Sequence, residues 1–368
     1  MAKEKKEGTK KVIREQINEQ EESGIGYNQM PPKDVFAYNE LRSCSDLFIL
    51  HNKKILEIQP EFQRNEVWPL DLQTRFIDSL LKELPIPSMC FSYDKDRNEM
   101  RVIDGLQRIT SIIKFLNTRK EWKLSALEDI DPRISGKTNI QINKENPVIF
   151  SNIQNLSLPV TFLRVDHSKI SHDEYLFEIF HRLNTYGRKL NNQEIRNCIF
   201  SGTFNNFIKD LNKKDYWKKL LNVKNDNRFL KTELILRFFA FFDDYKNYKG
   251  KLTKFLNDYM SLHRNAKEDD LEKKGLLFKE TVNLILENIS DGKVLPRKPS
   301  NAFMESLLFG VAKNLTYLKK IDKKTIKKYY KKLNENRNFK EENLLEGTMK
   351  VKKVSDRFKT AVLIFSGK

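Results

Sequence analysis

Cysteine and histidine are scarce in this chain of 368 residues. Its three cysteines, Cys44, Cys90 and Cys198, lie far apart and form no C-x-x-C pair, which argues against a disulfide framework and against a zinc site. The five histidines also lack the spacing of a metal-ligand motif. We therefore expect reduced thiols and no dedicated transition-metal site.

Long apolar runs are also missing. No stretch reaches the ~18 apolar residues of a membrane-spanning helix, and the N-terminus MAKEKKEGTKK lacks the apolar segment of a signal peptide. Hydrophobic residues make up 39% of the chain and charged residues 32%, which is typical of a soluble globular protein. We expect a cytoplasmic protein without a membrane partner, and the length allows one large or two ordinary domains.

Positive charge is in excess, with a formal net charge of +18. A basic surface raises the local concentration of polyanions and supports salt-dependent binding of nucleic acid. Alternatively, the chain is rich in Lys, Asn, Ile and Phe, a bias expected from an AT-rich genome, which makes a protein basic whatever its role. Both explanations stay open, because net charge concerns encounter and solubility rather than fold.

Three segments follow one another along the chain. Residues 1–34 form a flexible charged tail, whose balance of basic and acidic residues argues against a nucleic-acid-binding arm. Residues 35–168 alternate strand and helix patterns, whereas the pattern from 169–368 is mainly helical. The sequence therefore predicts an α+β fold, in which a small mixed domain precedes an α-helical one.

Individual elements can be placed within these segments. In the mixed domain we expect a strand over residues 53–60, a helix over 70–84, a hairpin of 87–94 with 99–104, and a strand over 156–166. Beyond it we expect helices over 171–187 and 319–333 and a central buried helix over 232–245. Another helix should begin near Asn191, which forms a capping box with Glu194.

The stretch VIDGLQRITSIIKFL, residues 102–116, places charged and polar residues where a strand passes into a helix. Gly105 lets the backbone approach a ligand, and the first helical turn offers unpaired N–H groups to an anion. Arg108 adds a planar cation suited to phosphate, and Gln107 can donate or accept a hydrogen bond. Asp104 can hold Mg²⁺ or orient an arginine. Together these residues predict a phosphate site.

Ordinary helix chemistry offers an alternative for the same stretch. Asp104 then caps the helix, while Gln107 and Arg108 are solvated residues of its first turn. A second stretch, IQPEFQRNEVWPLD, carries Gln63 and Arg64 between a strand and a helix. Its aromatic residues are best explained by core packing, but its Gln-Arg pair can converge with the first on one polyanion.

A third stretch, FHRLNTYGRKLNNQEIRN, contains Arg182, Asn184, Glu194 and Arg196. Here the structural alternatives are strong, because Glu194 can simply complete its helix cap and Arg196 can be a solvated helix residue. In this order and at these separations, the three stretches resemble the N-terminal domain of GmrSD-type modification-dependent restriction systems. The resemblance covers residues 40–200.

That domain belongs to the ParB/sulfiredoxin-like superfamily, with an Asp-Gly-Gln-Gln-Arg box as its hallmark. The resemblance implies a domain of anti-phage defence that binds and often hydrolyses nucleotides and is coupled to DNA recognition or to control of a nuclease. It implies an NTP with Mg²⁺ as the ligand, with the base open. The nucleotide-binding residues implied are Gln63, Arg64, Asp104, Gly105, Gln107, Arg108, Arg182 and Asn184.

Within this set, Asp104 and Arg108 are the expected catalytic residues, and no residue is assigned as a permanent metal ligand. The first glutamine of the box is Leu106 here, so hydrolysis is less firmly implied than binding. Many relatives also carry an HNH nuclease, but no histidine follows His263. We therefore expect a stand-alone regulatory protein with DNA and a separate nuclease as partners. The alternative is a ParB-like DNA-binding protein without nucleotide turnover, and homo-oligomerisation stays open.

Overall fold

The computed structural model describes residues 31–58, 68–183, 190–222, 226, 228–293, 295, 300–344 and 347–368, with only the backbone at 341 and 342. Contacts divide the chain into an N-terminal unit, residues 29–190, and a C-terminal unit, residues 191–368. The expected tail, residues 1–34, lies outside the described residues except for its last four. One of these, Asp34, pairs with Lys169 and His172.

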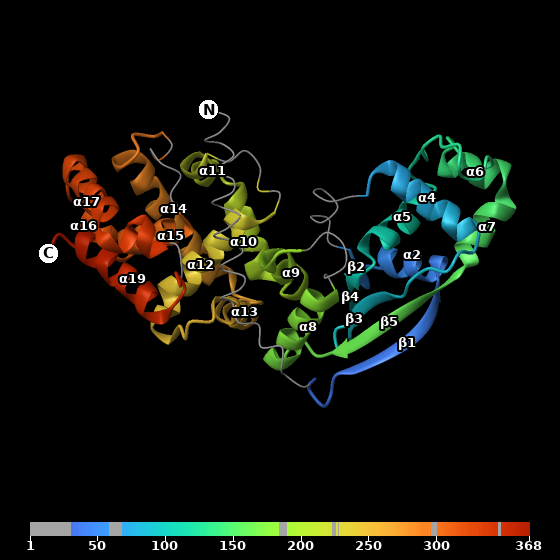
Figure 1. The fold of residues 1–368 in the computed structure, drawn as a ribbon, viewed down its shortest axis with the longest axis horizontal. Coiled ribbons are helices and arrows are strands. Elements are labelled where there is room, and N and C mark those ends of the chain that lie inside the picture. Colours follow the sequence, from blue (N-terminus) through green and yellow to red (C-terminus); the bar gives the residue numbers. More distant parts are fainter. Residues whose placement is uncertain are drawn as a thin grey trace. The chain divides into compact units, whose positions relative to one another are not determined.

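The N-terminal unit is built on a mixed five-stranded sheet (Figure 1). Its strands are β1 (Phe36–Ser43), β2 (Leu56–Glu57), β3 (Met89–Asp94), β4 (Glu99–Asp104) and β5 (Ser157–Val165). The order across the sheet is β1-β5-β3-β4-β2, in which β3 and β4 form the predicted antiparallel hairpin. β5 runs parallel to β3 and antiparallel to β1, and β2 runs parallel to β4.

Helices gather over one face of this sheet (Figure 1). They are α2 (Cys44–Asn52), α4 (Leu70–Leu81), α5 (Leu106–Leu116), α6 (Asn139–Glu145) and α7 (Pro147–Asn155). Their apolar stripes bury residues such as Ile109, Ile112 and Phe115 against sheet residues such as Phe91 and Phe162. This packing fixes α5, and with it the residues of its first turn. The helix predicted over 70–84 is confirmed as α4, and the helix predicted after Gly105 is confirmed as α5, whereas β1, α2, α6 and α7 were not predicted.

Helix α8 (Ile170–Leu183) follows β5 and belongs to the N-terminal unit. The two units therefore divide between Leu190 and Asn191, one helix later than the division placed at residue 168 from sequence. α8 begins as expected near residue 171, and its expected last residues, 184–187, lie outside the described part of the chain.

In the described part of the C-terminal unit, all the regular secondary structure is helical. Its α-helices are α9 (Asn192–Ile199), α10 (Thr203–Lys213), α11 (Asp215–Leu221), α12 (Leu230–Asp244), α13 (Leu252–Leu262), α14 (Glu268–Asn288), α15 (Asn301–Lys313), α16 (Leu315–Leu318), α17 (Lys323–Glu335), α18 (Glu341–Leu344) and α19 (Val351–Phe365). As predicted, α12 is the central buried helix, with Phe238, Phe239 and Phe241 almost fully enclosed. The α+β class predicted from sequence is confirmed.

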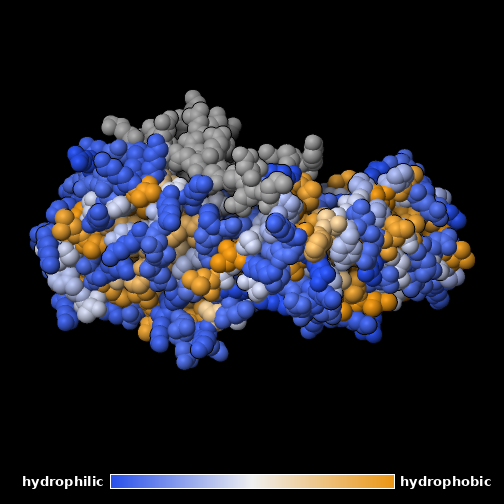
Figure 2. Space-filling model, turned by 90° about the horizontal axis from the view of Figure 1, so that it is seen from below, coloured by the Kyte–Doolittle hydropathy of each residue, from blue (hydrophilic) through white to orange (hydrophobic). Residues whose placement is uncertain are grey.

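Polar side chains cover most of the face drawn in Figure 2, and apolar residues form only small patches on it. Among the described residues, none of the helices combines the length and the apolar character needed to cross a bilayer.

Candidate nucleotide site

The Asp-Gly-Leu-Gln-Arg box lies where β4 ends and α5 begins. Asp104 is the last residue of β4, and Gly105 is the N-cap of α5 with a φ of +93°. This left-handed backbone favours glycine, and a Cβ at this position would stand 2.5 Å from Cγ of Met89. Packing against Met89 therefore accounts for the glycine, and the space beside its Cα is filled by protein.

Asp104 and Arg108 are joined one helical turn apart. Nη2 of Arg108 donates to Oδ2 of Asp104 at 2.7 Å, and Nη1 of Arg108 donates to the carbonyl of Pro87. The side chain of Arg108 is 13% exposed, whereas that of Asp104 is 48% exposed. The capping alternative for Asp104 is therefore wrong, because no side chain caps α5, and Arg108 is not a solvated residue. Asp104 orients the guanidinium, as one of its two expected roles requires.

Gln107 connects the box to the second motif. Its Oε1 accepts a hydrogen bond from the backbone N–H of Trp68 at 2.9 Å. The backbone carbonyl of Trp68 in turn accepts a hydrogen bond from Nε2 of Gln73 at 2.6 Å. The Trp68 ring packs edge to face on Phe76, with centroids 5.8 Å apart, so its predicted core role is confirmed. Trp68 is thus held at both backbone polar groups and at its side chain.

Gln63 and Arg64 themselves lie outside the described residues. The segment that carries them leaves from β2, in which Glu57 pairs in register with Arg101 of β4. It returns at Trp68, which Gln107 holds. Both ends of the segment are therefore tied to the strand and helix that carry the box.

Leu106 occupies the position of the first glutamine in the family's box. Its side chain is partly buried and packs against the hydrophobic core of the N-terminal unit. The apolar substitution is thus accommodated by packing, at the cost of an amide that could donate to or accept from a ligand.

The third motif is distributed over both units. Arg182 lies near the end of α8 in the N-terminal unit, is 56% exposed and pairs with Glu178, while Asn184 lies outside the described residues. Glu194 lies on α9 in the C-terminal unit, where it completes the predicted capping box with Asn191. These side chains are thus not shown to meet the box.

Arg196 differs from its expected solvated state. It is 1% exposed, and its guanidinium donates to Oδ1 of Asn257 at 2.8 Å and to Glu233 at 2.9 Å. Burial lowers the pKa of Arg196, and the carboxylate of Glu233 opposes that effect. The arginine is therefore part of the packing of α9, α12 and α13.

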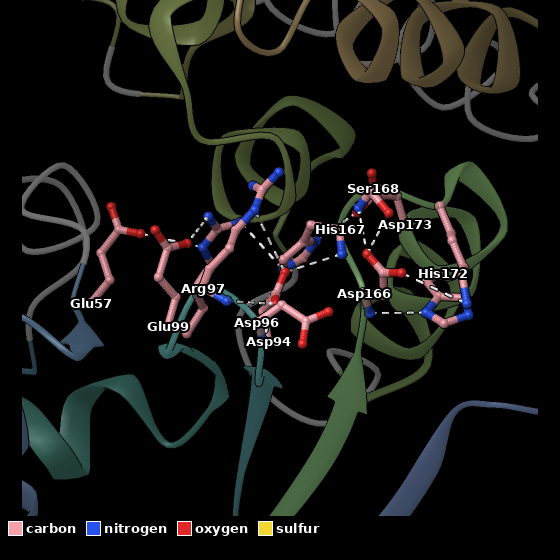
Figure 3. Close-up of polar contacts among 12 residues, drawn as sticks. Glu57, Asp94, Asp96, Arg97, Glu99, Asp166, His167, Ser168, His172 and Asp173 are labelled. Carbon is pink, nitrogen blue, oxygen red and sulfur yellow. Dashed lines mark hydrogen bonds and ion pairs between the residues drawn. The ribbon is translucent and has the colours of Figure 1, made fainter.

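A second polar cluster in the N-terminal unit escaped the sequence interpretation (Figure 3). Nδ1 of His167 is 2.7 Å from Oδ1 of Asp173, and the His167 backbone N–H donates to Asp94. Nη1 of Arg101 approaches Nε2 of His167 at 3.4 Å, and all four side chains are buried. The prediction that Asp166 and His167 lie at a strand end is confirmed. Their sequence context gave no indication that His167 would contact Asp94, Arg101 and Asp173.

This buried cluster connects β3, β4 and the end of β5 to the first turn of α8. It therefore positions the helix on which Arg182 lies. Among the described residues, no group of three or more His, Cys, Asp or Glu side chains is arranged to hold a metal ion. A Mg²⁺ ion in this unit would need oxygen ligands from a phosphate-bearing molecule in addition to a carboxylate such as that of Asp104.

The comparison with protein families gives one match, which covers residues 45–201. The matching model describes the GmrSD restriction endonuclease N-terminal domain. The match contains all three motifs and extends from α2 to the end of α9. No curated protein matches the chain. Residues 45–201 are therefore similar to the GmrSD restriction endonuclease N-terminal domain.

Proposed function

We propose that this protein is the nucleotide-binding regulatory component of a restriction system, and that it binds an NTP with Mg²⁺ at the box on β4 and α5. One observation carries the proposal. Arg108 is held in a fixed orientation by Asp104 beside the N-terminus of α5, and Gln107 ties the same turn to the segment that bears Gln63 and Arg64. The described ends of the segment that bears Gln63 and Arg64, at Glu57 and Trp68, are thus held by β4 and α5, the elements that carry the box.

The chemistry of these residues suits a polyphosphate. The guanidinium of Arg108 presents a planar set of donors that matches phosphate oxygens, and Arg64 would supply a second cation. Asp104 keeps half of its side chain accessible, so its carboxylate can contact Mg²⁺. The bound ion would neutralise charge on the phosphates.

Hydrolysis is a separate part of the proposal. Turnover needs a group that orients water, and Leu106 has none to offer. Asp104 is then the residue that must do so, and we expect turnover to be slow and to depend on its carboxylate. A separate nuclease partner would cut DNA.

Isothermal titration calorimetry with a panel of NTPs and Mg²⁺ tests binding, and release of inorganic phosphate tests turnover. We expect Arg108→Ala to weaken binding 10-fold or more, because a charge-assisted hydrogen bond contributes about 1.5–3 kcal/mol. Arg75→Ala is the matched control, since Arg75 forms an exposed ion pair with Asp129 in the same unit. Unchanged affinity in a folded Arg108→Ala protein would contradict the proposal.

The rival function is DNA binding without any nucleotide. The excess of positive charge favours this function. A measurement of DNA affinity separates it from the proposal, because a protein that binds DNA without nucleotide would have the same affinity with and without NTP.

A further inference from the structure

The positive charge of this protein is concentrated in one unit. Residues 191–368 contain 39 Lys and Arg against 22 Asp and Glu, a formal charge of +17, which leaves +1 for residues 1–190. The nucleotide-binding candidate therefore lies in an almost neutral unit. An AT-rich genome would bias both parts of the chain alike, so composition alone does not explain this asymmetry.

Helix α17 carries the densest group of these charges. Its sequence KKTIKKYYKKLNE places six lysines in two rows spaced by four residues, 323, 327 and 331 in one and 324, 328 and 332 in the other. The opposite side of the helix buries Ile326 and Leu333 in the unit's core. The lysines thus form one outward-facing surface, which we call the α17 lysine face.

Acidic neighbours compensate only part of this surface. Lys323 and Lys327 share the carboxylate of Asp291, at 2.8 and 2.6 Å, and Lys331 lies 3.8 Å from Glu335. Hydrogen bonds from Lys323 and Lys327 hold the pKa of Asp291 down to about 2. In the described part of the chain, the second row (Lys324, Lys328 and Lys332) has no acidic partner, and all three side chains are exposed. Repulsion along each row disfavours the helix, so the uncompensated face is not explained by stability.

The α17 lysine face continues onto a neighbouring helix. Helix α14 contacts both α11 and α17. Lys219 of α11 lies beside Gly292, because its Nζ is 3.9 Å from the position that a Cβ on this glycine would take. The preceding residue, Asp291, binds Lys323 and Lys327 of α17. The basic surface therefore spans α17 and the end of α11.

We propose that the α17 lysine face, with Lys219, docks the phosphate backbone of duplex DNA. The second row extends roughly 12 Å along the helix axis, which matches the axial length of three to four phosphates on one strand. The choice of DNA rests on the proposed role in a restriction system. The binding surface itself rests on the charges alone.

The composition of the face indicates how it binds. Lysine is a point charge suited to phosphates, whereas the planar side chains of Arg, Asn and Gln, which read base edges with paired hydrogen bonds, lie in neither row. Single-stranded nucleic acid is held by stacking on exposed aromatic rings. The tyrosines of α17 instead contact protein, with Tyr330 against Phe303 and Tyr329 against Phe365. The face therefore suits a duplex backbone without regard to base sequence.

The test is fluorescence anisotropy with a 30-base-pair duplex over a range of salt concentrations. Each lost phosphate contact lowers the slope of log Kobs against log salt by about 0.9. We expect the triple variant Lys324→Gln, Lys328→Gln and Lys332→Gln to reduce that slope by about 2 to 3, for duplexes of unrelated sequence alike.

A matched triple variant, Lys246→Gln, Lys249→Gln and Lys352→Gln, removes the same net charge. All three lysines are exposed. Lys352 lies at the first turn of α19, whereas α17 contacts the opposite end of that helix, at Phe365. We expect this variant to keep the slope of the wild type. Equal loss in both variants would show an effect of net charge only and would overturn the proposal, as would tighter binding of single-stranded DNA or of duplex RNA.

The measurement needs no nucleotide. Failure of NTP binding in calorimetry would leave the slope difference intact, and an unchanged slope in the α17 variant would leave NTP binding intact. An unchanged thermal unfolding temperature shows that the α17 variant is folded.

Discussion

Arg108 and Asp104 form an ion pair of 2.7 Å between the first turn of α5 and the end of β4. The pair is unequal, because the arginine is largely enclosed while half of the carboxylate faces solvent. An incoming phosphate would share Arg108 with Asp104, and the carboxylate would repel that phosphate unless a cation lay between them. We therefore expect phosphate binding at this pair to depend on Mg²⁺.

We expect Asp104→Asn to reverse that dependence. Without Mg²⁺ the variant should bind NTP more tightly than the wild type, because the repulsive charge is gone while an amide oxygen can still accept from Arg108. With Mg²⁺ it should bind several-fold more weakly, and phosphate release should fall to background. Calorimetry with Mg²⁺ and with EDTA gives both affinities, and equal losses in the two buffers would show that Asp104 acts only through the fold.

Gln107 offers a way to separate folding from binding. Gln107→Ala leaves the partly buried N–H of Trp68 without its acceptor, so we expect the free energy of unfolding to fall by about 0.5–1.5 kcal/mol. Gln107→Glu keeps an acceptor for Trp68 but adds a negative charge beside the proposed phosphates. It should retain stability and lose NTP affinity, which urea unfolding and calorimetry measure separately. Full NTP affinity in the Glu variant would place the phosphates elsewhere.

The elements that could be predicted from sequence are those whose signals are local. The β3–β4 hairpin, the apolar stripe of α5 and the capping box of Asn191 with Glu194 each depend on residues close together in the chain. Strand β1 was not predicted, because its hydrogen-bonding partner β5 lies more than a hundred residues away.

The candidate site shows the same division. Its residue types and the strand-to-helix junction follow from the motif, but the bond from Gln107 to Trp68 joins residues 39 positions apart. Arg196 looked solvated because its partners Asn257 and Glu233 are 61 and 37 positions away. Burial of a charge is decided by such distant partners, which helical periodicity does not reveal.

Gly105 and Met89 provide a test of the packing beneath the box. Gly105→Ala adds a Cβ at 2.5 Å from Cγ of Met89 and forces a side chain into the left-handed backbone region. We expect a loss of stability of about 1–3 kcal/mol from the backbone alone, and more from the clash. Met89→Ala removes the contact with Cγ and leaves Cβ at 3.0 Å, so Gly105→Ala should cost less stability in the Met89→Ala background than in the wild type, as thermal unfolding of both pairs measures. Complete rescue would mean that the backbone conformation costs nothing.

The three cysteines should be unreactive in the folded protein. All are buried, and burial raises the pKa of Cys44 and of Cys90 to about 12. The charge of Asp104, which pairs in register with Cys90, contributes to the raised pKa of that thiol. At pH 8 the thiolate fraction of Cys44 and of Cys90 is then roughly 1,000-fold below that of an exposed thiol, so alkylation of these two should require unfolding. Mass spectrometry after iodoacetamide treatment, with and without urea, measures this, and rapid labelling of native Cys90 would show that the β3–β4 junction opens to solvent.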